Sequence, residues 1–165
     1  MILLDTDVCI IILRGNRQVI EHRKNCDERV AIFFMTVGEL YYGAERSKYK
    51  TKNANLIEEF LLSIEIINTE IDILQRFGRL KENLNDREIT LPDADILIAS
   101  VALSKCSKLI TVNINHFNRF ENLTIENWIR LSVYISTIKP SGQYKIHNHN
   151  SLYIFGTGRF QFFHF

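Results

Sequence analysis

Short runs of consecutive apolar residues alternate along most of the chain with longer stretches in which apolar residues recur every three or four positions. The short runs have the continuous apolar character of strands buried on both faces of a parallel sheet, and they cover residues 2–4, 30–34, 64–67, 109–111 and, more weakly, 123–126. The helical stretches cover residues 8–13, 18–25, 36–46, 55–62, 70–84 and 93–104. This alternation predicts a three-layer α/β domain with a mostly parallel central sheet flanked by helices.

The stretch 70–84 has the clearest amphipathic pattern of the predicted helices. Its apolar residues Ile71, Leu74 and Phe77, with Leu84 less regularly, recur at helical spacing. Such a stripe is typical of a helix that packs one face on a core. We therefore expect these side chains to point inwards.

Polar residues collect where the predicted parallel strands end, which is where open α/β sheets place their working sites. Asp5 follows the first strand, Thr36 to Glu39 follow the second, and Asn113 to His116 follow the fourth. Asp93 and Asp95 precede the fourth strand at the start of an apolar helix. Segments that are far apart in the sequence therefore deliver acids, or residues that can replace them, to one edge of the sheet.

Several carboxylates at one place raise one another's pKa unless a cation neutralises them. Oxygen ligands without cysteine or paired histidine favour Mg²⁺ or Mn²⁺ over Zn²⁺. Ions of this kind activate a water molecule and stabilise a leaving oxygen in phosphodiester hydrolysis. The acids therefore indicate a metal-dependent phosphodiesterase.

Each of these residues also has a purely structural interpretation. Asp5 and Asp93 lie where a side chain can cap the following helix, and Glu39 ends a Thr-x-x-Glu pattern that is typical of a capping box. His116 fits a hydrogen-bonded loop residue as well as a ligand. Asp95 lies too deep in its helix to be the N-cap, so it needs another partner.

The sequence Asp5-Thr6-Asp7 leaves a second enzymatic interpretation open. Asp5 would be the nucleophile of an aspartyl phosphotransferase and Asp7 its acid, with a covalent phospho-aspartate as intermediate. Asp7 equally suits a cap for a helix that begins at Val8.

A basic run from Arg46 to Lys52 is typical of a solvated face, and near a cleft it would follow an RNA backbone.

Composition and charge narrow the class of protein. Hydrophobic residues make up 46% of the 165 residues and charged residues 24%, so the chain can fill a core. Twenty Lys and Arg against nineteen Asp and Glu give a net charge of +1, which excludes a strongly basic nucleic-acid coat protein. The three cysteines are far apart and form neither a zinc motif nor a disulfide framework.

The start of the chain and its last part differ from the middle in ways that bear on location and domains. Acids at positions 5 and 7 argue against a signal peptide, and the apolar run 8–13 is much shorter than the ~20 residues of a membrane span. We therefore expect a cytoplasmic protein that does not associate with membranes.

Residues 132–165 hold no acid and eight of the eighteen aromatic residues. This shift predicts one domain over residues 1–131 and a C-terminal extension over residues 132–165.

Five segments of the chain, in order, resemble the signatures of PIN-domain ribonucleases, and the last is similar to the end of the VapC toxins of type II toxin–antitoxin systems. The segments are Met1-Ile-Leu-Leu-Asp5-Thr6-Asp7, Thr36-Val-Gly-Glu39-Leu-Tyr-Tyr-Gly43, Leu91-Pro-Asp-Ala-Asp95-Ile-Leu-Ile-Ala99, Leu109-Ile-Thr111-Val-Asn113-Ile-Asn-His116-Phe117 and Phe120-Glu-Asn-Leu123-Thr-Ile-Glu-Asn-Trp128. The resemblance covers about residues 1–131 and implies a PIN-like fold there.

The resemblance also implies a set of site residues. Asp5 and Asp95 would be the primary ligands of Mg²⁺ or Mn²⁺, Glu39 would complete the cluster or position the attacking water, and Asp93 would assist as an auxiliary ligand. Some relatives have a further acid where this chain has Asn113 and His116, so these two residues are included among the candidate catalytic residues. Asn113 would hold a metal-bound water through its side-chain oxygen.

The function implied by the resemblance is that of a Mg²⁺-dependent endoribonuclease that acts as a toxin. Its substrate would be RNA, such as a tRNA, and a cognate antitoxin protein would inhibit it. A homodimer would be expected. The alternative is a catalytically weak or inactive PIN-like domain that binds RNA or protein and keeps its acids for folding.

Overall fold

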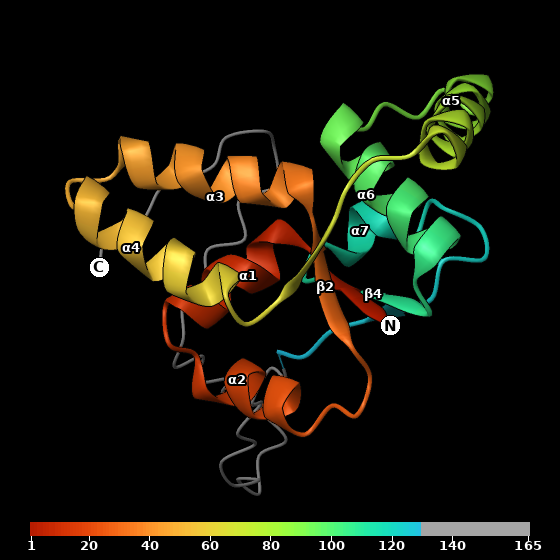
Figure 1. The fold of residues 1–165 in the computed structure, drawn as a ribbon. Helices are drawn as coiled ribbons and strands as arrows, with labels where there is room; N and C mark the ends of the chain where they lie inside the picture. Colours follow the sequence, from red (N-terminus) through yellow and green to blue (C-terminus); the bar gives the residue numbers. More distant parts are fainter. Residues whose placement is uncertain (130–165) are drawn as a thin grey trace, which may run out of the picture. The chain divides into compact units, whose positions relative to one another are not determined.

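A parallel five-stranded sheet lies at the centre of the computed structural model, which describes residues 1–129 (Figure 1). The order of the strands is β3-β2-β1-β4-β5. Their bounds are β1 Ile2–Leu4, β2 Val30–Phe33, β3 Glu65–Ile67, β4 Lys108–Ile110 and β5 Ile125–Glu126. In the central strand β1, Leu3 is paired with Ala31 of β2 and with Leu109 of β4. The predicted parallel sheet is confirmed.

Seven helices accompany these strands within residues 1–129. They are α1 Thr6–Leu13, α2 Arg17–Lys24, α3 Phe34–Arg46, α4 Lys50–Leu61, α5 Ile71–Asp86, α6 Asp93–Lys105 and the short α7 Ile114–Phe117. Most bounds agree with the predicted ones to within a few residues. The helix α7 was not predicted, because four residues are too few to show a helical period.

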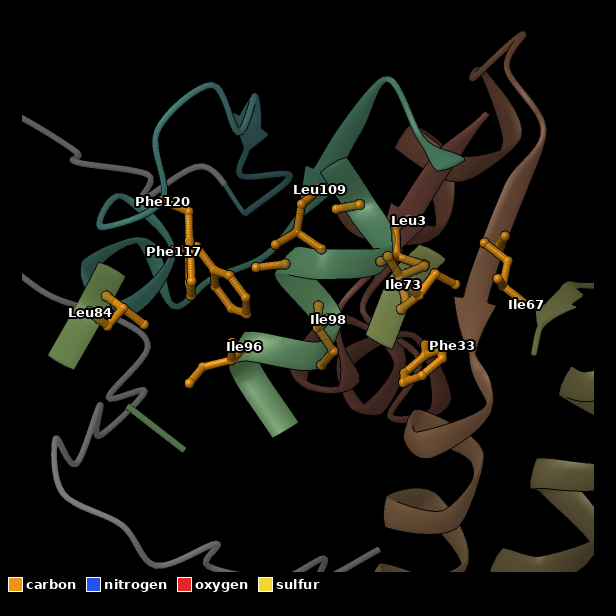
Figure 2. Packing of buried hydrophobic residues seen from close by; sticks show 14 residues of the cluster. Leu3, Phe33, Ile67, Ile73, Leu84, Ile96, Ile98, Leu109, Phe117 and Phe120 are labelled. Atoms are coloured by element: carbon orange, nitrogen blue, oxygen red, sulfur yellow. The ribbon is translucent and has the colours of Figure 1, made fainter. Parts of the chain in front are cut away.

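Two apolar cores lie on the two faces of the sheet, as a three-layer domain requires. Leu3 of β1 belongs to a cluster with residues of α5, α6 and α7, whereas its neighbours Ile2 and Leu4 belong to a cluster with residues of α1, α2, α3 and α4. Successive side chains of a strand point to opposite faces, so one short strand serves both cores. Figure 2 shows the first cluster, with Ile73 of α5 and Ile98 of α6 among its side chains.

The inward face of α5 agrees with the predicted one at Phe77 and Leu84 and differs from it in the first turn. Ile71 is 70% exposed and Leu74 is 44% exposed, while Ile73 is fully buried. The stripe that meets α6 and the sheet runs from Ile73 through Phe77 to Leu84. Ile73 continues the stripe of Phe77, Leu80 and Leu84 at spacings of three and four residues, whereas Ile71 and Leu74 lie on the face that continues with Gly78 and Lys81.

The predictions on membrane association and on the domain boundary can be compared with the structure only within the described residues. Within residues 1–129, no helix is both long and apolar enough to cross a membrane. The predicted boundary near Leu131 and the aromatic extension 132–165 lie outside the described residues.

Candidate functional site

Asp5 lies at the junction of β1 and α1, where the chain leaves the centre of the sheet. It is the N-cap of α1, and its Oδ1 accepts a hydrogen bond of 2.8 Å from the backbone N–H of Thr6. The Thr111 hydroxyl, just beyond β4, donates to Oδ2 of Asp5 at 2.6 Å. Asp5 is only 6% exposed. The capping interpretation of Asp5 is therefore confirmed, but the cap leaves a carboxylate buried at the carboxyl end of the sheet.

Glu39 comes from α3 and is held against the start of α1. The Thr6 hydroxyl donates to Oε2 of Glu39 and also lies 3.2 Å from the hydroxyl of Thr36. The predicted capping box is wrong, because α3 begins at Phe34 and no side chain caps it. Thr36 lies inside the first turn and is fully buried. Glu39 is thus free of a capping role and available to the acid cluster.

Asp95 is the third residue of α6, and its partner is a histidine from α7. Nδ1 of His116 lies 2.6 Å from Oδ2 of Asp95. A carboxylate can only accept, so Nδ1 carries the proton in this pair. Asn113 precedes α7, and its backbone N–H donates to the Thr111 hydroxyl at 3.0 Å. The loop after β4 is therefore tied both to Asp5, through Thr111, and to Asp95, through His116.

The acids of this cluster interact electrostatically. Burial, followed by the charge of Asp7 and, more weakly, that of Asp95, raises the pKa of Asp5 to about 7, against the hydrogen bonds from Thr111 and Thr6. Burial and Asp95 also raise the pKa of Asp7, although Arg14 and His116 act in the opposite direction. A cluster that resists ionisation in this way is a place where a cation would be stabilising.

Glu39 shares this environment. Its pKa is raised mainly by burial, and the charges of Asp95 and Asp7 act in the same direction, while the hydrogen bond from Thr6 opposes them. The structure therefore brings Asp5, Glu39 and Asp95 together, as the sequence predicted, and adds Asp7 to them. The four acids come from α3, α6 and the start of α1, so they meet only in the folded chain.

Asp93 is not part of this cluster. Its carboxylate is 61% exposed and forms a salt bridge of 2.8 Å with Lys81 of α5. It also does not cap α6, because the N-cap is Pro92 and Asp93 is already the first helical residue. Residues 93 and 95 lie about 200° apart around a helix, so only one of them can face the sheet edge. The structure does not place Asp93 as an auxiliary ligand.

Three threonines that contact the acids or one another have no functional role in the sequence pattern: Thr6, Thr36 and Thr111. Their common signal is position, because each lies at the end of a predicted strand or two residues beyond it. The sequence fits Asp7 either as the acid of a phosphotransferase or as a cap for a helix from Val8. The helix begins two residues earlier than that interpretation requires, at Thr6, so Asp7 is in its first turn rather than at its cap.

The donor atoms of the cluster suit a hard divalent cation, since all are carboxylate oxygens. Among residues 1–129, however, no three acidic, cysteine or histidine side chains converge as a preformed metal site. Glu39 and Asp95 each have one oxygen turned to a neighbouring side chain. Carboxylate oxygens carry two lone pairs each and the side chains rotate readily, so the set of residues fits a metal ion after local adjustment.

Comparison with known proteins finds relatives of one family. The family model described as PIN domain matches residues 2–123. Ribonuclease VapC2 of Rickettsia felis is 31% identical over 131 residues, which are 76% of this chain and 96% of that protein. The tRNA(fMet)-specific endonuclease VapC of Salmonella typhimurium is 28% identical over 127 residues, again 76% of this chain and 96% of that protein.

Solved structures show the same fold in these relatives. The crystal structure of VapBC2 from Rickettsia felis, bound to a DNA fragment from its promoter, matches with a TM-score of 0.74 and 30% identity over 78% of this chain and 100% of that one. The DNA-bound VapBC of Salmonella typhimurium matches with a TM-score of 0.74 and 26% identity over 78% of this chain and 98% of that one. The chain therefore belongs to the PIN-domain family and, within it, to the VapC ribonucleases.

Proposed function

We propose that this protein is a metal-dependent endoribonuclease that acts as the toxin of a toxin–antitoxin pair. The observation that carries the proposal is the meeting of Asp5, Glu39 and Asp95 at the carboxyl ends of the strands, with the pKa of Asp5 raised to about 7. Acids that stay charged there need a cation, and PIN-domain ribonucleases generally depend on a divalent metal ion. The names of the relatives support RNA as the substrate.

Each side chain has a defined part in the proposed reaction. Asp5, Glu39 and Asp95 would hold Mg²⁺ or Mn²⁺, and Thr111 and His116 would keep Asp5 and Asp95 in place. The bound ion would supply a water of lowered pKa for attack on the phosphodiester and positive charge for the leaving oxygen. Asn113 is the N-cap residue of α7, and in the proposed reaction its side-chain oxygen would hold the metal-bound water.

An aspartyl phosphotransferase is a poorer match to the geometry. A nucleophilic carboxylate needs an exposed, ionised oxygen. Asp5 is 6% exposed, and both of its oxygens accept hydrogen bonds. A phosphotransferase also gives no part to Glu39 and Asp95, whereas a metal ion would use all three acids.

The proposed partners are an antitoxin protein and a second copy of the chain. VapBC complexes among the similar structures support an antitoxin. Light scattering on the purified chain tests the homodimer, and co-purification with a small protein encoded next to it tests the antitoxin.

The nuclease itself is tested by cleavage of total tRNA and of a mixed RNA pool with Mg²⁺, Mn²⁺ or EDTA. We expect discrete cuts by the wild type that require metal and are lost in Asp95→Asn. Asp93→Asn is the matched control, because it changes a carboxylate two residues away, outside the cluster, and should cleave like the wild type. Cleavage that persists in Asp95→Asn, or a folded wild type without activity on either pool, would contradict the proposal.

A further inference from the structure

Thr6 is a buried residue that contacts two acids of the cluster at once. It is 4% exposed and is the first residue of α1. Its backbone N–H donates to Asp5, and its side-chain hydroxyl contacts Oε2 of Glu39. Asp5 and Glu39 are 34 positions apart in the sequence, and Thr6 is the residue through which they are joined by hydrogen bonds.

The hydrogen bonds that join Thr36, Thr6 and Glu39 all donate in one direction. A hydroxyl carries a single proton, and an ionised carboxylate can only accept. Thr6 therefore donates to Glu39, and the hydroxyl of Thr36, 3.2 Å away, donates to the oxygen of Thr6. Thr36 is fully buried, so water does not replace it. The two hydroxyls form a chain that ends on one oxygen of Glu39.

Helix capping does not explain why the hydroxyls of Thr6 and Thr36 are placed in this way. The cap of α1 is already supplied by Asp5, and α3 has no side-chain cap although Thr36 lies in its first turn. Both hydroxyls are instead used across the contact between α1 and α3. A glutamate has several rotatable bonds, so a fixed hydrogen bond to one oxygen restricts where its other oxygen can lie.

We propose that Thr6 is a positioning residue whose hydroxyl, supported by Thr36, orients the carboxylate of Glu39 toward the divalent ion that it shares with Asp5. This inference rests on the proposed metal-dependent function. Hydrogen-bond partners of metal ligands typically contribute ten- to a hundred-fold to metal affinity, so roughly a ten-fold effect is expected from one hydroxyl. Thr6 itself need not touch the ion.

The test is Mn²⁺ binding to the full-length, metal-free protein, measured by isothermal titration calorimetry. Thr6→Val keeps the shape of the side chain and removes the donor, so we expect about ten-fold weaker binding. Thr6→Ser restores the hydroxyl and should bind nearly like the wild type. Ser100→Ala is the matched control, because Ser100 is also buried but donates to the Ile96 carbonyl of its own helix. Its Mn²⁺ affinity should not change.

Cleavage gives a second measure of the same effect. The Mn²⁺ concentration for half-maximal RNA cleavage should rise about ten-fold in Thr6→Val, and the rate at saturating Mn²⁺ should recover toward that of the wild type. Circular dichroism confirms that each variant is folded. If Thr6→Val does not fold, Thr6→Ala is the second variant without a hydroxyl and carries the same expectation.

The outcomes separate this inference from the function on which it rests. A wild type that binds no Mn²⁺ would overturn the metal-dependent function, and the role of Thr6 with it. A wild type that binds Mn²⁺, together with a folded Thr6→Val of equal affinity, would overturn only the role of Thr6. Binding by Thr6→Ser that is as weak as that of Thr6→Val would also overturn it, because the hydroxyl would then not be the cause.

Discussion

Replacing Asp5 by asparagine should stabilise the metal-free protein at pH 8. Burial is the main cause that raises the pKa of Asp5 from 3.8 to about 7. A rise of that size means that holding the ionised carboxylate in the folded chain costs roughly 4 kcal/mol, because each pKa unit corresponds to about 1.4 kcal/mol. Asparagine has nearly the same shape and carries no charge.

The pH dependence follows from the direction of the shift. Between about pH 4 and pH 7 the folded chain binds a proton at Asp5 that the unfolded chain has already lost. Protonated Asp5 therefore contributes its full stability below 3.8, the pKa of the group in the unfolded chain. This contribution is lost as the pH rises through about 7, the pKa of Asp5 in the folded chain. The advantage of Asp5→Asn should be absent near pH 4 and complete above pH 7.

The local hydrogen bonds should survive the exchange. The amide oxygen of asparagine can accept from the backbone N–H of Thr6, as Oδ1 of Asp5 does. Its NH₂ group can donate to the Thr111 hydroxyl, which has lone pairs to accept. Relaxation and repacking will reduce the full effect, so we expect a gain of about 1–4 kcal/mol, or several degrees in Tm.

The measurement is urea and thermal unfolding in EDTA from pH 4.5 to pH 8.5, for the wild type, Asp5→Asn and the control Asp93→Asn. The exposed, ion-paired Asp93 should give a change below about 0.5 kcal/mol with little dependence on pH. At pH 8, Mn²⁺ should raise the Tm of the wild type and leave Asp5→Asn nearly unchanged. The explanation is wrong if Asp5→Asn is less stable than the wild type at pH 8, or if the difference between them is the same at every pH.

Three further outcomes are expected from single substitutions. His116→Ala should weaken Mn²⁺ binding about ten-fold in calorimetry, because Asp95 loses the hydrogen bond from Nδ1, and unchanged affinity would show that this pair does not matter for the site. Lys81→Ala removes an exposed salt bridge to Asp93 and should lower the free energy of unfolding by less than about 1 kcal/mol, with Mn²⁺ affinity unaffected. Phe117→Ala removes a fully buried ring and should cost about 3–5 kcal/mol in urea unfolding, and a loss below 1 kcal/mol would contradict its place in the core.

The secondary structure was largely predictable from the sequence. The strand β1 is short and apolar without interruption, which is the pattern of a strand buried on both faces. The helix α6 was equally clear from its length and apolar content. The prediction for the first turn of α5 was wrong, because it buried Ile71 and Leu74 instead of Ile73, which continues the stripe of Phe77 and Leu84.

The site was predictable to a similar degree. Asp5, Glu39 and Asp95 follow from their positions relative to the strands, because parallel strands place their carboxyl ends at one edge. The expectation that Asp93 assists Asp95 ignored the turn of about 200° between residues two positions apart on a helix. The salt bridge of Asp93 with Lys81 of another helix had no signal in the sequence. Sequence patterns describe neighbours along the chain and carry little information on contacts between helices.

The sequence by itself therefore determined the parallel α/β order and three of the acids that meet at its edge. The tertiary structure alone decided that Asp7 joins them, that His116 is the partner of Asp95, and that Thr6 links Asp5 to Glu39. The physical reason is that periodicity and caps depend on residues a few positions apart. The protonation and orientation of a buried carboxylate depend on every group that packing brings within a few ångströms of it.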